Sequence, residues 1–350
     1  MYKGILEKYR EHLPLTDKTP IFTLGEGNTP LVRSRRIEKI IGCQELYFKL
    51  ENTNPSGSFK DRGMVLAVAK ISEAGLDQAI CASTGNTSAS AASYSAYCGI
   101  SLTVLLPKGT VTDSKLAQIV AHGARIIQVD TNFDKTLELC RIINREHSIP
   151  LLNSVNTDRL EGQKTAAFEI VEDLNEAPDF VYLPVGNGGN ISAYWKGFND
   201  VYRLGWATFN PRMIGLQAIG ADPIVENRLI DDPETIATAI RIGNPASWKL
   251  VRNAINESSG SIWGVSDDQI IEAYNILSRD EGIFCEPASA AAVAGLLTSR
   301  NKDVCLEGKK VVCIITGTGL KDVGFATGFI RNDIETSSSD ISNLERMLHV

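Results

Sequence analysis

The sequence has little of what metal, nucleic-acid and membrane proteins depend on. It contains four histidines and seven cysteines in 350 residues, and neither type shows the close spacing of metal-ligand or redox motifs. The formal net charge is −7 and no basic run occurs, so nucleic acid and anionic membrane surfaces are poor partners. No apolar stretch reaches the roughly eighteen residues of a membrane span. These absences favour small-molecule chemistry without a metal.

The cysteines and the chain ends are typical of an intracellular protein. The cysteines are scattered, and we expect them to be reduced and mostly buried. Cys81 and Cys313 lie in apolar runs of strand length, where a packing role is favoured over a nucleophilic one. Residues 1–14 alternate charged with apolar side chains, as an amphipathic surface helix does. We therefore expect an uncleaved cytoplasmic chain whose polar end, from Ser337 onward, is a loosely held tail.

Short apolar runs alternate with longer helical patterns, which indicates an α/β protein with parallel sheets covered by helices. A chain of 350 residues is long enough for two domains. Strands are expected at residues 46–50, 78–82, 102–106, 125–129, 150–152, 180–185, 213–219 and 311–315. Helices are expected at residues 60–73, 87–98, 114–122, 133–147, 159–175, 191–204, 267–281 and 289–299.

Lys60 is the residue most indicative of chemistry. It follows a turn of asparagine, proline, serine and glycine at residues 54–59 and begins a predicted apolar helix. Beside a buried apolar wall, a lysine can lose its proton near neutral pH and react as a free amine with an aldehyde. Pyridoxal phosphate is the aldehyde cofactor that proteins bind in this way. An ordinary helix start with a solvated lysine has the same local pattern, so this segment alone leaves both interpretations open.

A glycine-rich segment, Gly186-Asn187-Gly188-Gly189-Asn190, joins a predicted strand to a predicted helix. Its backbone N–H groups and the helix dipole can converge on a phosphate dianion, and glycine permits close approach. A generic strand-to-helix turn is the alternative. The sequence has no Gly-x4-Gly-Lys-Ser/Thr loop, which argues against a nucleotide-binding protein.

Five segments together give a more specific signal than any one of them. In order, they are Gly-Glu-Gly-Asn-Thr-Pro-Leu at residues 25–31, the lysine segment at 54–63, Ala-Ser-Thr-Gly-Asn-Thr-Ser at 82–88, the glycine-rich segment at 186–190 and Thr-Gly-Thr-Gly-Leu-Lys-Asp at 316–322. With the run at residues 153–197, they closely resemble the threonine synthases, pyridoxal-phosphate enzymes of fold type II, also called tryptophan synthase β-like. The resemblance covers the chain from about Gly25 to about Gly328.

The resemblance implies the architecture of fold type II. Two domains with parallel-rich sheets flanked by helices would enclose a site in the cleft between them. A smaller inserted domain is expected at residues 51–149, and a larger domain at residues 1–50 and 150–350. Enzymes of this fold are commonly homodimers, so a homodimer is expected here as well.

The resemblance also implies how pyridoxal phosphate is held. Lys60 would carry the cofactor and act as the catalytic group, Asn86 would donate to the phenolic oxygen, and Thr316 would partner the pyridine nitrogen. The implied cofactor-binding residues are Lys60, Asn86, Gly186, Asn187, Gly188, Gly189, Asn190 and Thr316. Because a hydroxyl cannot hold a compensating negative charge beside a protonated ring nitrogen, Thr316 predicts a ring that withdraws electrons less strongly than an aspartate-partnered one.

The implied substrate, O-phospho-L-homoserine, presents a carboxylate and a phosphate. The implied substrate-binding residues are Ser83, Thr84, Thr87, Ser154, Arg159 and Asn187. The first three surround a predicted helix N-terminus, which suits the carboxylate. The other three are expected at the phosphate with Thr87 shared, and Arg159 can clamp two phosphate oxygens at once. Glu286 lies in a family-like segment near the ring, and we interpret it as a residue that orients its neighbours.

The implied reaction joins elimination of phosphate from Cγ to addition of water at Cβ, and yields L-threonine, the end of threonine biosynthesis. The amine of Lys60 would move the Cα and Cβ protons. Three alternatives stay open: a cysteate synthase, which sequence separates poorly, a serine/threonine dehydratase, and a noncatalytic relative. The Lys60-Asp61-Arg62-Gly63 run and Thr316 argue against the dehydratase, and the joint presence of Lys60, Asn86 and Thr316 argues against the noncatalytic relative.

Overall fold

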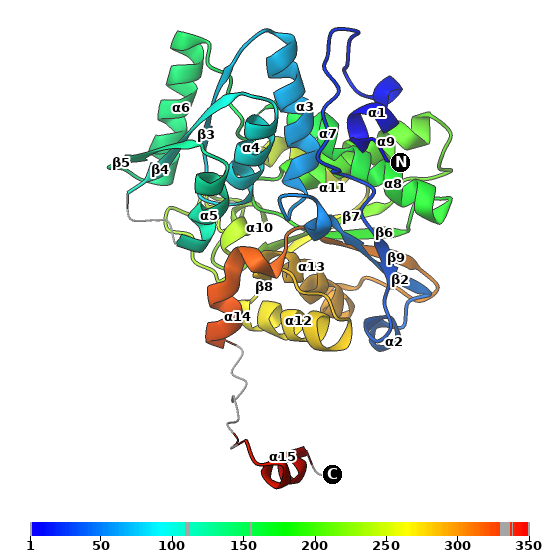
Figure 1. Ribbon diagram of the computed structural model, residues 1–350. Coiled ribbons are helices and arrows are strands. Elements are labelled where there is room, and N and C mark those ends of the chain that lie inside the picture. Colours follow the sequence, from blue (N-terminus) through cyan, green and yellow to red (C-terminus); the bar gives the residue numbers. More distant parts are fainter. Residues whose placement is uncertain (1, 109–112, 155, 330–336, 338, 349–350) are drawn as a thin grey trace.

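Two separate sheets form the framework of the protein (Figure 1). The computed structural model describes residues 2–108, 113–154, 156–329, 337 and 339–348. Within these residues the larger sheet has six strands in the order β1-β2-β9-β6-β7-β8, all parallel except the edge pair β1 and β2. Its strands are β1 (Leu31–Arg33), β2 (Glu45–Leu50), β6 (Phe180–Pro184), β7 (Arg212–Ala218), β8 (Ser261–Val265) and β9 (Lys310–Ile315).

The smaller sheet is parallel throughout and has the order β3-β4-β5. Its strands are β3 (Gln78–Ala82), β4 (Ser101–Pro107) and β5 (Arg125–Val129). An isolated parallel bridge between Ile80 and Leu151 extends it on the β3 side. All three strands fall within the segment 51–149, for which a smaller domain is predicted.

Helices connect the strands and cover both sheets (Figure 1). The longer ones are α3 (Lys60–Glu73), α4 (Asn86–Tyr97), α5 (Asp113–Ala121), α6 (Phe133–His147), α7 (Thr157–Gln163), α8 (Thr165–Leu174), α9 (Gly189–Arg203), α11 (Trp248–Glu257), α12 (Asp267–Asp280), α13 (Pro287–Leu297), α14 (Val323–Phe329) and α15 (Ile341–Leu348). Short helices are α1 (Gly4–Lys8), α2 (Ile37–Ile41) and α10 (Pro223–Glu226). None of the described helices is both long and apolar enough to cross a membrane.

The central strands are apolar on both faces because helices cover both sides of the larger sheet. In β9, Val312 and Ile314 face the core shared with α8 and α9, whereas Val311 and Cys313 face the core formed with α12 and α13. Helix α13 is apolar almost all round, as expected of a helix buried between the sheet and α12. Because successive residues face two different buried cores, these strands are continuous apolar runs in the sequence.

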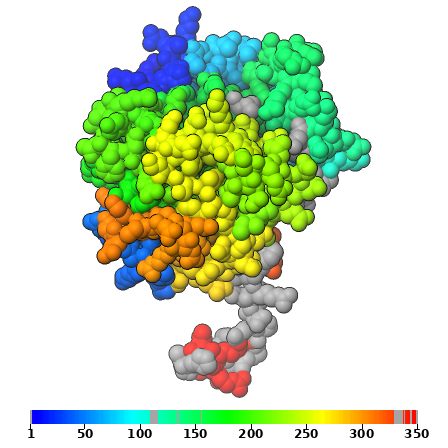
Figure 2. Space-filling view, turned by 180° about the vertical axis from the view of Figure 1, so that it is seen from behind, coloured from blue at the N-terminus to red at the C-terminus, as the bar shows by residue number. Residues whose placement is uncertain are grey.

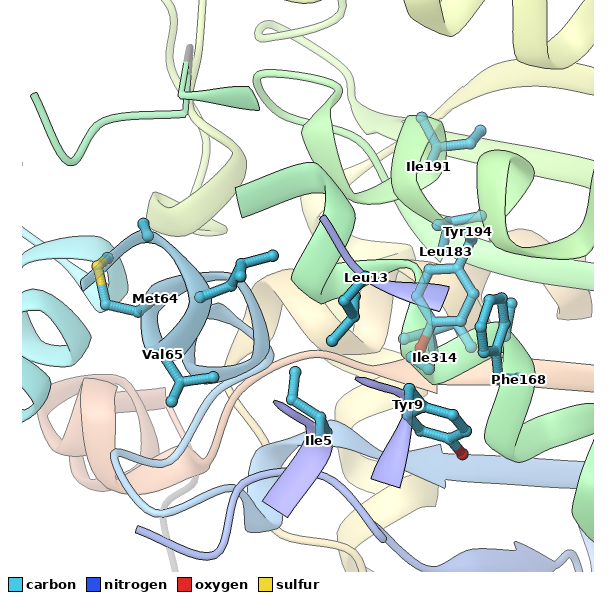
Figure 3. Packing of buried hydrophobic residues seen from close by; sticks show 14 of the residues in the cluster. Ile5, Tyr9, Leu13, Met64, Val65, Phe168, Leu183, Ile191, Tyr194 and Ile314 are labelled. Carbon is cyan, nitrogen blue, oxygen red and sulfur yellow. The ribbon is translucent and has the colours of Figure 1, made fainter. Parts of the chain in front are cut away.

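The N-terminal segment lies at the surface, as predicted, and packs its apolar face into the core shared with α8 and α9. Ile5 and Tyr9 are almost fully buried, and Figure 3 shows them between Val65 of α3 and Phe168 of α8. The rings of Tyr9 and Phe168 meet edge to face at 5.3 Å between centroids. The predicted amphipathic helix is therefore short, and its apolar face joins α3 to α8.

A buried ion network holds the same region together. The Arg62 guanidinium lies 2.7 Å from a carboxylate oxygen of Glu51 and 2.6 Å from one of Glu169. Lys49 approaches Glu169 to 2.9 Å, and the hydroxyl of Thr29 donates to Glu51. The backbone N–H groups of residues 28 and 29 also donate to Glu169, so the segment before β1 is fixed to α3 and α8.

Figure 2 shows the opposite side of the molecule, where the yellow part of the chain, around residues 240–280, lies in the middle of the face. This part includes α11 and α12. Helix α11 packs against α9 and β7. It therefore lies next to the glycine-rich segment that precedes α9.

Most predicted elements occur where they were expected, with three differences. The helix predicted at 159–175 is two helices, α7 and α8, separated at Lys164. The strand predicted at 150–152 is reduced to the single bridge at Leu151. Part of the predicted tail forms α15, and the rest of it includes residues 338 and 349–350, which lie outside the described residues.

Candidate active site

Lys60 is the first residue of α3, and its neighbours fix the turn before it. The carboxylate of Asp61 accepts hydrogen bonds from the backbone N–H and the hydroxyl of Ser56, at 2.6 and 2.5 Å, and from the hydroxyl of Ser90 in α4, at 2.5 Å. Asp61 is fully buried. The turn is therefore pinned from within and also attached to α4.

The same turn pairs with the end of β9. The backbone N–H of Phe59 donates to the carbonyl of Thr316 at 3.0 Å, and that of Thr318 donates to the carbonyl of Gly57, also at 3.0 Å. The end of β9 thus runs beside Lys60. The structure brings Lys60 and Thr316 together, although 256 positions, from 60 to 316, separate them in the sequence.

The surroundings of Lys60 favour the neutral amine. Burial and, to a smaller extent, the positive charge of Arg159 lower its pKa to about 7, against the opposing effect of Glu286. The Nζ atom lies 3.6 Å from the ring centroid of Phe59, and the side chain keeps partial exposure. A free amine at neutral pH, close to an apolar ring, is what imine chemistry with an aldehyde requires.

Arg159 is a buried cation without an ion pair among the described residues. It lies in the first turns of α7 and is 1% exposed. One guanidinium nitrogen donates to the carbonyl of Leu152 at 3.1 Å, while Nε has no partner. Burial lowers its pKa to about 10. A buried cation of this kind is costly unless an anion meets it, so the position suits an anionic ligand.

Asn86 begins α4 and faces Glu286, the residue before α13. Its amide nitrogen lies 3.1 and 3.0 Å from the two carboxylate oxygens of Glu286. Both residues are buried, and burial raises the pKa of Glu286. This contact joins the helix after β3 to the helix that covers the larger sheet. It also agrees with the interpretation of Glu286 as a residue that orients its neighbours.

Asn153 brings two further loops together. Its side-chain oxygen accepts from the backbone N–H of Ala82 at 2.9 Å, and its amide nitrogen donates to the carbonyl of Ala82 at 2.6 Å. The loop with Ser83 and Thr84 therefore starts beside the loop with Ser154. Sequence reasoning did not single out Asn153, since its partner is 71 positions away.

The glycine-rich segment forms the turn between β6 and α9. Gly188 has a φ of +85°, a conformation that side chains other than glycine rarely adopt, and a Cβ there would lie 2.3 Å from Val251 of α11. Asn187 accepts on its carbonyl from the backbone N–H of Ser247 at 3.0 Å. Among the described residues no side chain caps the N-terminus of α9, so its first backbone N–H groups lack a side-chain cap.

Asn190 is the most informative side chain of this turn. It is 8% exposed, yet within the described part of the chain neither its amide nitrogen nor its amide oxygen has a hydrogen-bond partner. Leu160, next to Arg159 in α7, lies close to Gly189. Helix α7 therefore connects the glycine-rich turn with the region of Lys60.

Three predicted substrate residues show no contact that would define a role. Thr84, Thr87 and Ser154 are partly exposed. Ser83 accepts from the backbone N–H of Gly85 at 3.2 Å, within its own loop. These side chains lie on the loops that begin or adjoin α4, and their hydrogen-bonding groups are available to a ligand.

Comparisons with known proteins decide the family. The family model described as "Pyridoxal-phosphate dependent enzyme" matches residues 22–317. A threonine synthase of Bacillus sp. (strain ULM1) is 50% identical, over 99% of this chain and 97% of the relative. Another, of Methanocaldococcus jannaschii, is 48% identical over 97% of this chain and 86% of the relative. The chain belongs to the threonine synthase family of pyridoxal-phosphate-dependent enzymes.

Solved structures agree on the fold of this family member. Maize serine racemase matches with a TM-score of 0.77 at 22% identity, over 94% of this chain and 97% of that one. A threonine deaminase of Solanum lycopersicum matches with a TM-score of 0.71 at 19% identity, over 92% of this chain and 82% of that one. At these identities the matches establish the fold type II architecture alone.

As a member of the threonine synthase family, the protein is a pyridoxal-phosphate-dependent lyase, and its residues fit the cofactor. Among the described residues, no side chain caps the N-terminus of α9 and the Asn190 amide has no partner, and both features suit a phosphate. Lys60 offers a neutral amine, and the hydroxyl of Thr316, which lies 2.8 Å from that of Ser289, offers a hydrogen bond to a pyridine nitrogen. Among the described residues no cluster of potential metal ligands occurs.

Proposed function

We propose that the protein converts O-phospho-L-homoserine and water into L-threonine and inorganic phosphate. The observation that carries the proposal is the buried, unpaired Arg159 beside Lys60, in a chain about 50% identical to threonine synthases. A dianionic phosphate on the substrate would provide the anion that Arg159 lacks within the protein. An unphosphorylated amino acid would leave that cation buried without a partner.

Pyridoxal phosphate, when bound, supplies an electron sink that stabilises negative charge on the substrate carbons. Lys60 would hold it covalently, with Asn86 at its phenolic oxygen and Thr316 at its ring nitrogen. The turn formed by Gly186, Asn187, Gly188, Gly189 and Asn190 would hold its phosphate.

The chain's own groups would then transfer the protons. The Lys60 amine, with its pKa lowered to about 7, can take a proton from the substrate Cα, pass it on, and then take one from Cβ. Cγ and Cα would each regain a proton, and water would supply the hydroxyl on Cβ. Its position at the start of α3, pinned through Asp61, keeps that nitrogen in one place. The phosphate that departs from Cγ would carry its negative charge next to the guanidinium of Arg159, which stabilises it as a leaving group.

The two ends of the substrate would be held by different elements. The carboxylate would meet the N-terminus of α4 and the hydroxyls of Ser83, Thr84 and Thr87. The phosphate would meet Arg159 and Ser154, with Asn187 at the far side. The hydrogen bonds of Asn153 to Ala82 hold the loops of both groups together.

The reaction can be tested directly. Purified protein is incubated with O-phospho-L-homoserine, and threonine and phosphate are measured together for wild type and Lys60→Ala. Equal amounts of both products from wild type, and none from the variant, support the proposal. If wild type shows the absorbance of bound cofactor without either product, the substrate is wrong. Phosphoserine with sulfite and then serine and threonine would be tested next, as substrates of the two alternative enzymes.

The proposal extends to the assembly and to its motion. We infer a cytoplasmic homodimer, and a smaller domain at residues 51–149 that closes on the larger one when substrate binds. Closure would exclude water from the reacting carbons until it is needed. Small-angle scattering with and without a phosphonate analogue of the substrate tests both points. An unchanged profile contradicts closure, and a forward intensity of one chain contradicts the dimer.

A further inference from the structure

Glu286 is a buried carboxylate that the proposed reaction does not use. It is 5% exposed and stands at the N-cap of α13, yet its side chain does not cap that helix. No ion pair of Glu286 occurs among the described residues; its carboxylate turns toward Asn86. An uncompensated carboxylate is expensive to bury, so its retention points to a specific task.

The first contact of Glu286 is with Asn86, 200 positions earlier in the chain. The Asn86 amide carries two N–H donors on its nitrogen and an acceptor on its oxygen. A carboxylate accepts only, so it selects the orientation in which the nitrogen faces it, at 3.0 and 3.1 Å from its oxygens. One N–H shared between the two carboxylate oxygens would account for both contacts and leave the second N–H of this nitrogen for another acceptor.

The second contact is with the turn after β9. The backbone N–H of Glu286 donates to the carbonyl of Gly317 at 3.0 Å, and a Cβ at Gly317 would lie 2.5 Å from a carboxylate oxygen. The hydroxyl of Thr316 lies 3.5 Å from the same oxygen. Ser289, one turn into α13, accepts from the backbone N–H groups of Thr316 and Gly317 at 3.0 and 2.9 Å. The Glu286 carboxylate thus contacts both Asn86, at the start of α4, and Thr316, after β9.

Burial raises the pKa of Glu286, whereas the positive charges near it favour its ionised form. Lys60 and Lys321 are the positive groups that act on it, and Asp322 is the negative one. Glu286 in turn opposes the lowering of the Lys60 pKa. The carboxylate therefore acts on three groups of the site, namely Asn86, Thr316 and Lys60.

We propose that Glu286 is a positioning residue, which sets the orientation of the Asn86 amide so that one N–H points at the cofactor's phenolic oxygen. The inference rests on the proposed role of Asn86 in cofactor binding. Glu286 acts through Asn86 and does not itself take part in the reaction. Without the carboxylate, the Asn86 amide can turn its oxygen toward the cofactor, where it would repel the phenolic oxygen.

A double-mutant cycle on the cofactor-free protein tests this inference. Glu286→Gln, Asn86→Ala and the double variant are titrated with pyridoxal phosphate, and its affinity is measured from the absorbance of the bound cofactor. Because glutamine keeps an oxygen that can accept from Asn86, Glu286→Met, which lacks it, is titrated as well, alone and combined with Asn86→Ala. We expect Glu286→Met and Asn86→Ala each to weaken affinity about tenfold, the loss of one good hydrogen bond, and their double variant to be no weaker than Asn86→Ala. Additive losses, or wild-type affinity in Glu286→Met, would overturn the inference.

Two further variants guard against a change in folding. Asn86→Asp combined with Glu286→Gln restores an amide–carboxylate pair with the hydrogen bond reversed, so its thermal unfolding should be close to that of wild type. It should still bind pyridoxal phosphate weakly, because a carboxylate now faces the phenolic oxygen, and wild-type affinity would contradict the inference. Glu257→Gln, which alters a carboxylate that accepts from Trp195 in α9, is the matched control and should bind normally. No substrate is used, so the role of Glu286 is decided even if the proposed reaction is wrong.

Discussion

Gly63 of α3 and Gly162 of α7 face each other where the two helices cross. A Cβ at Gly162 would lie 2.0 Å from the carbonyl oxygen of Arg62, and one at Gly63 would lie 2.5 Å from that of Arg159. Backbone contacts thus set the distance between the helix that begins with Lys60 and the helix that carries Arg159. The charge of Arg159 can act on the Lys60 amine because the helices approach this closely.

Gly162→Ala should separate the two helices. The obstructing atom is a backbone oxygen, which cannot turn away as a side chain can, so we expect a loss of about 1–3 kcal/mol in the free energy of unfolding. Activity should fall as well, because Arg159 moves relative to Lys60. Urea unfolding and steady-state kinetics measure both effects. Gly324→Ala in α14, where a Cβ meets open space, is the control; equal behaviour of the two variants would contradict the crossing argument.

The Lys60 amine should titrate near neutral pH in the cofactor-free protein. Burial and then the charge of Arg159 lower its pKa to about 7 from its ordinary value of 10.5. The rate of Lys60 acetylation, followed by mass spectrometry between about pH 5 and about pH 11, should show this midpoint. Arg159→Met removes a positive charge and should raise it. A midpoint near that of the unfolded chain would show that Lys60 is solvated.

The same shift has a consequence for stability. Between pH values of about 7 and 10.5 the unfolded chain binds more protons at Lys60 than the folded chain does. This residue's contribution to the free energy of unfolding therefore rises with pH across that window and is lost as pH falls through about 7. Lys60→Met should remove this part of the pH dependence.

Much of the framework was predictable from sequence because short apolar runs alternate with longer helical patterns. The runs at 78–82 and 125–129 match β3 and β5, and the helix at 60–73 matches α3. Strand β8 was missed because Ser261-Ile262-Trp263-Gly264-Val265 lies at the edge of the sheet and mixes polar with apolar residues. The break between α7 and α8 was missed too, since Lys164 keeps helical dihedral angles and no proline marks it.

The candidate site was predictable only in part. Motifs pointed to Lys60, Asn86 and Thr316, because a reactive amine and the family-like loops leave a local pattern. The residues that hold them together, Asn153 and Ser289, left none. Their partners lie 71 and 27 positions away, and a hydrogen bond over such a separation has no periodicity to reveal it.

Glu169→Gln should destabilise the fold strongly. Although burial would raise the pKa of Glu169, Arg62 and Lys49 hold it well below the usual range. The variant leaves two buried cations with less compensating charge, and breaking such a pair costs about 3–5 kcal/mol. Urea unfolding measures the loss. Glu138→Gln, which breaks an exposed pair with Lys135, is the control and should have no measurable effect. Equal effects would show that the buried network adds nothing.

Arg159→Lys should separate substrate recognition from cofactor binding. Lysine keeps the positive charge but loses the planar fork that meets two phosphate oxygens at once, so we expect KM for O-phospho-L-homoserine to rise about tenfold or more. The absorbance of bound pyridoxal phosphate should not change, because the groups proposed to hold it lie on α3, α4, α9 and β9. Inorganic phosphate should also inhibit the variant less. Arg145→Lys alters an exposed arginine at the end of α6 and serves as the control. A normal KM with weakened cofactor binding would instead assign Arg159 to the cofactor phosphate and leave the substrate phosphate to Ser154 and Asn187.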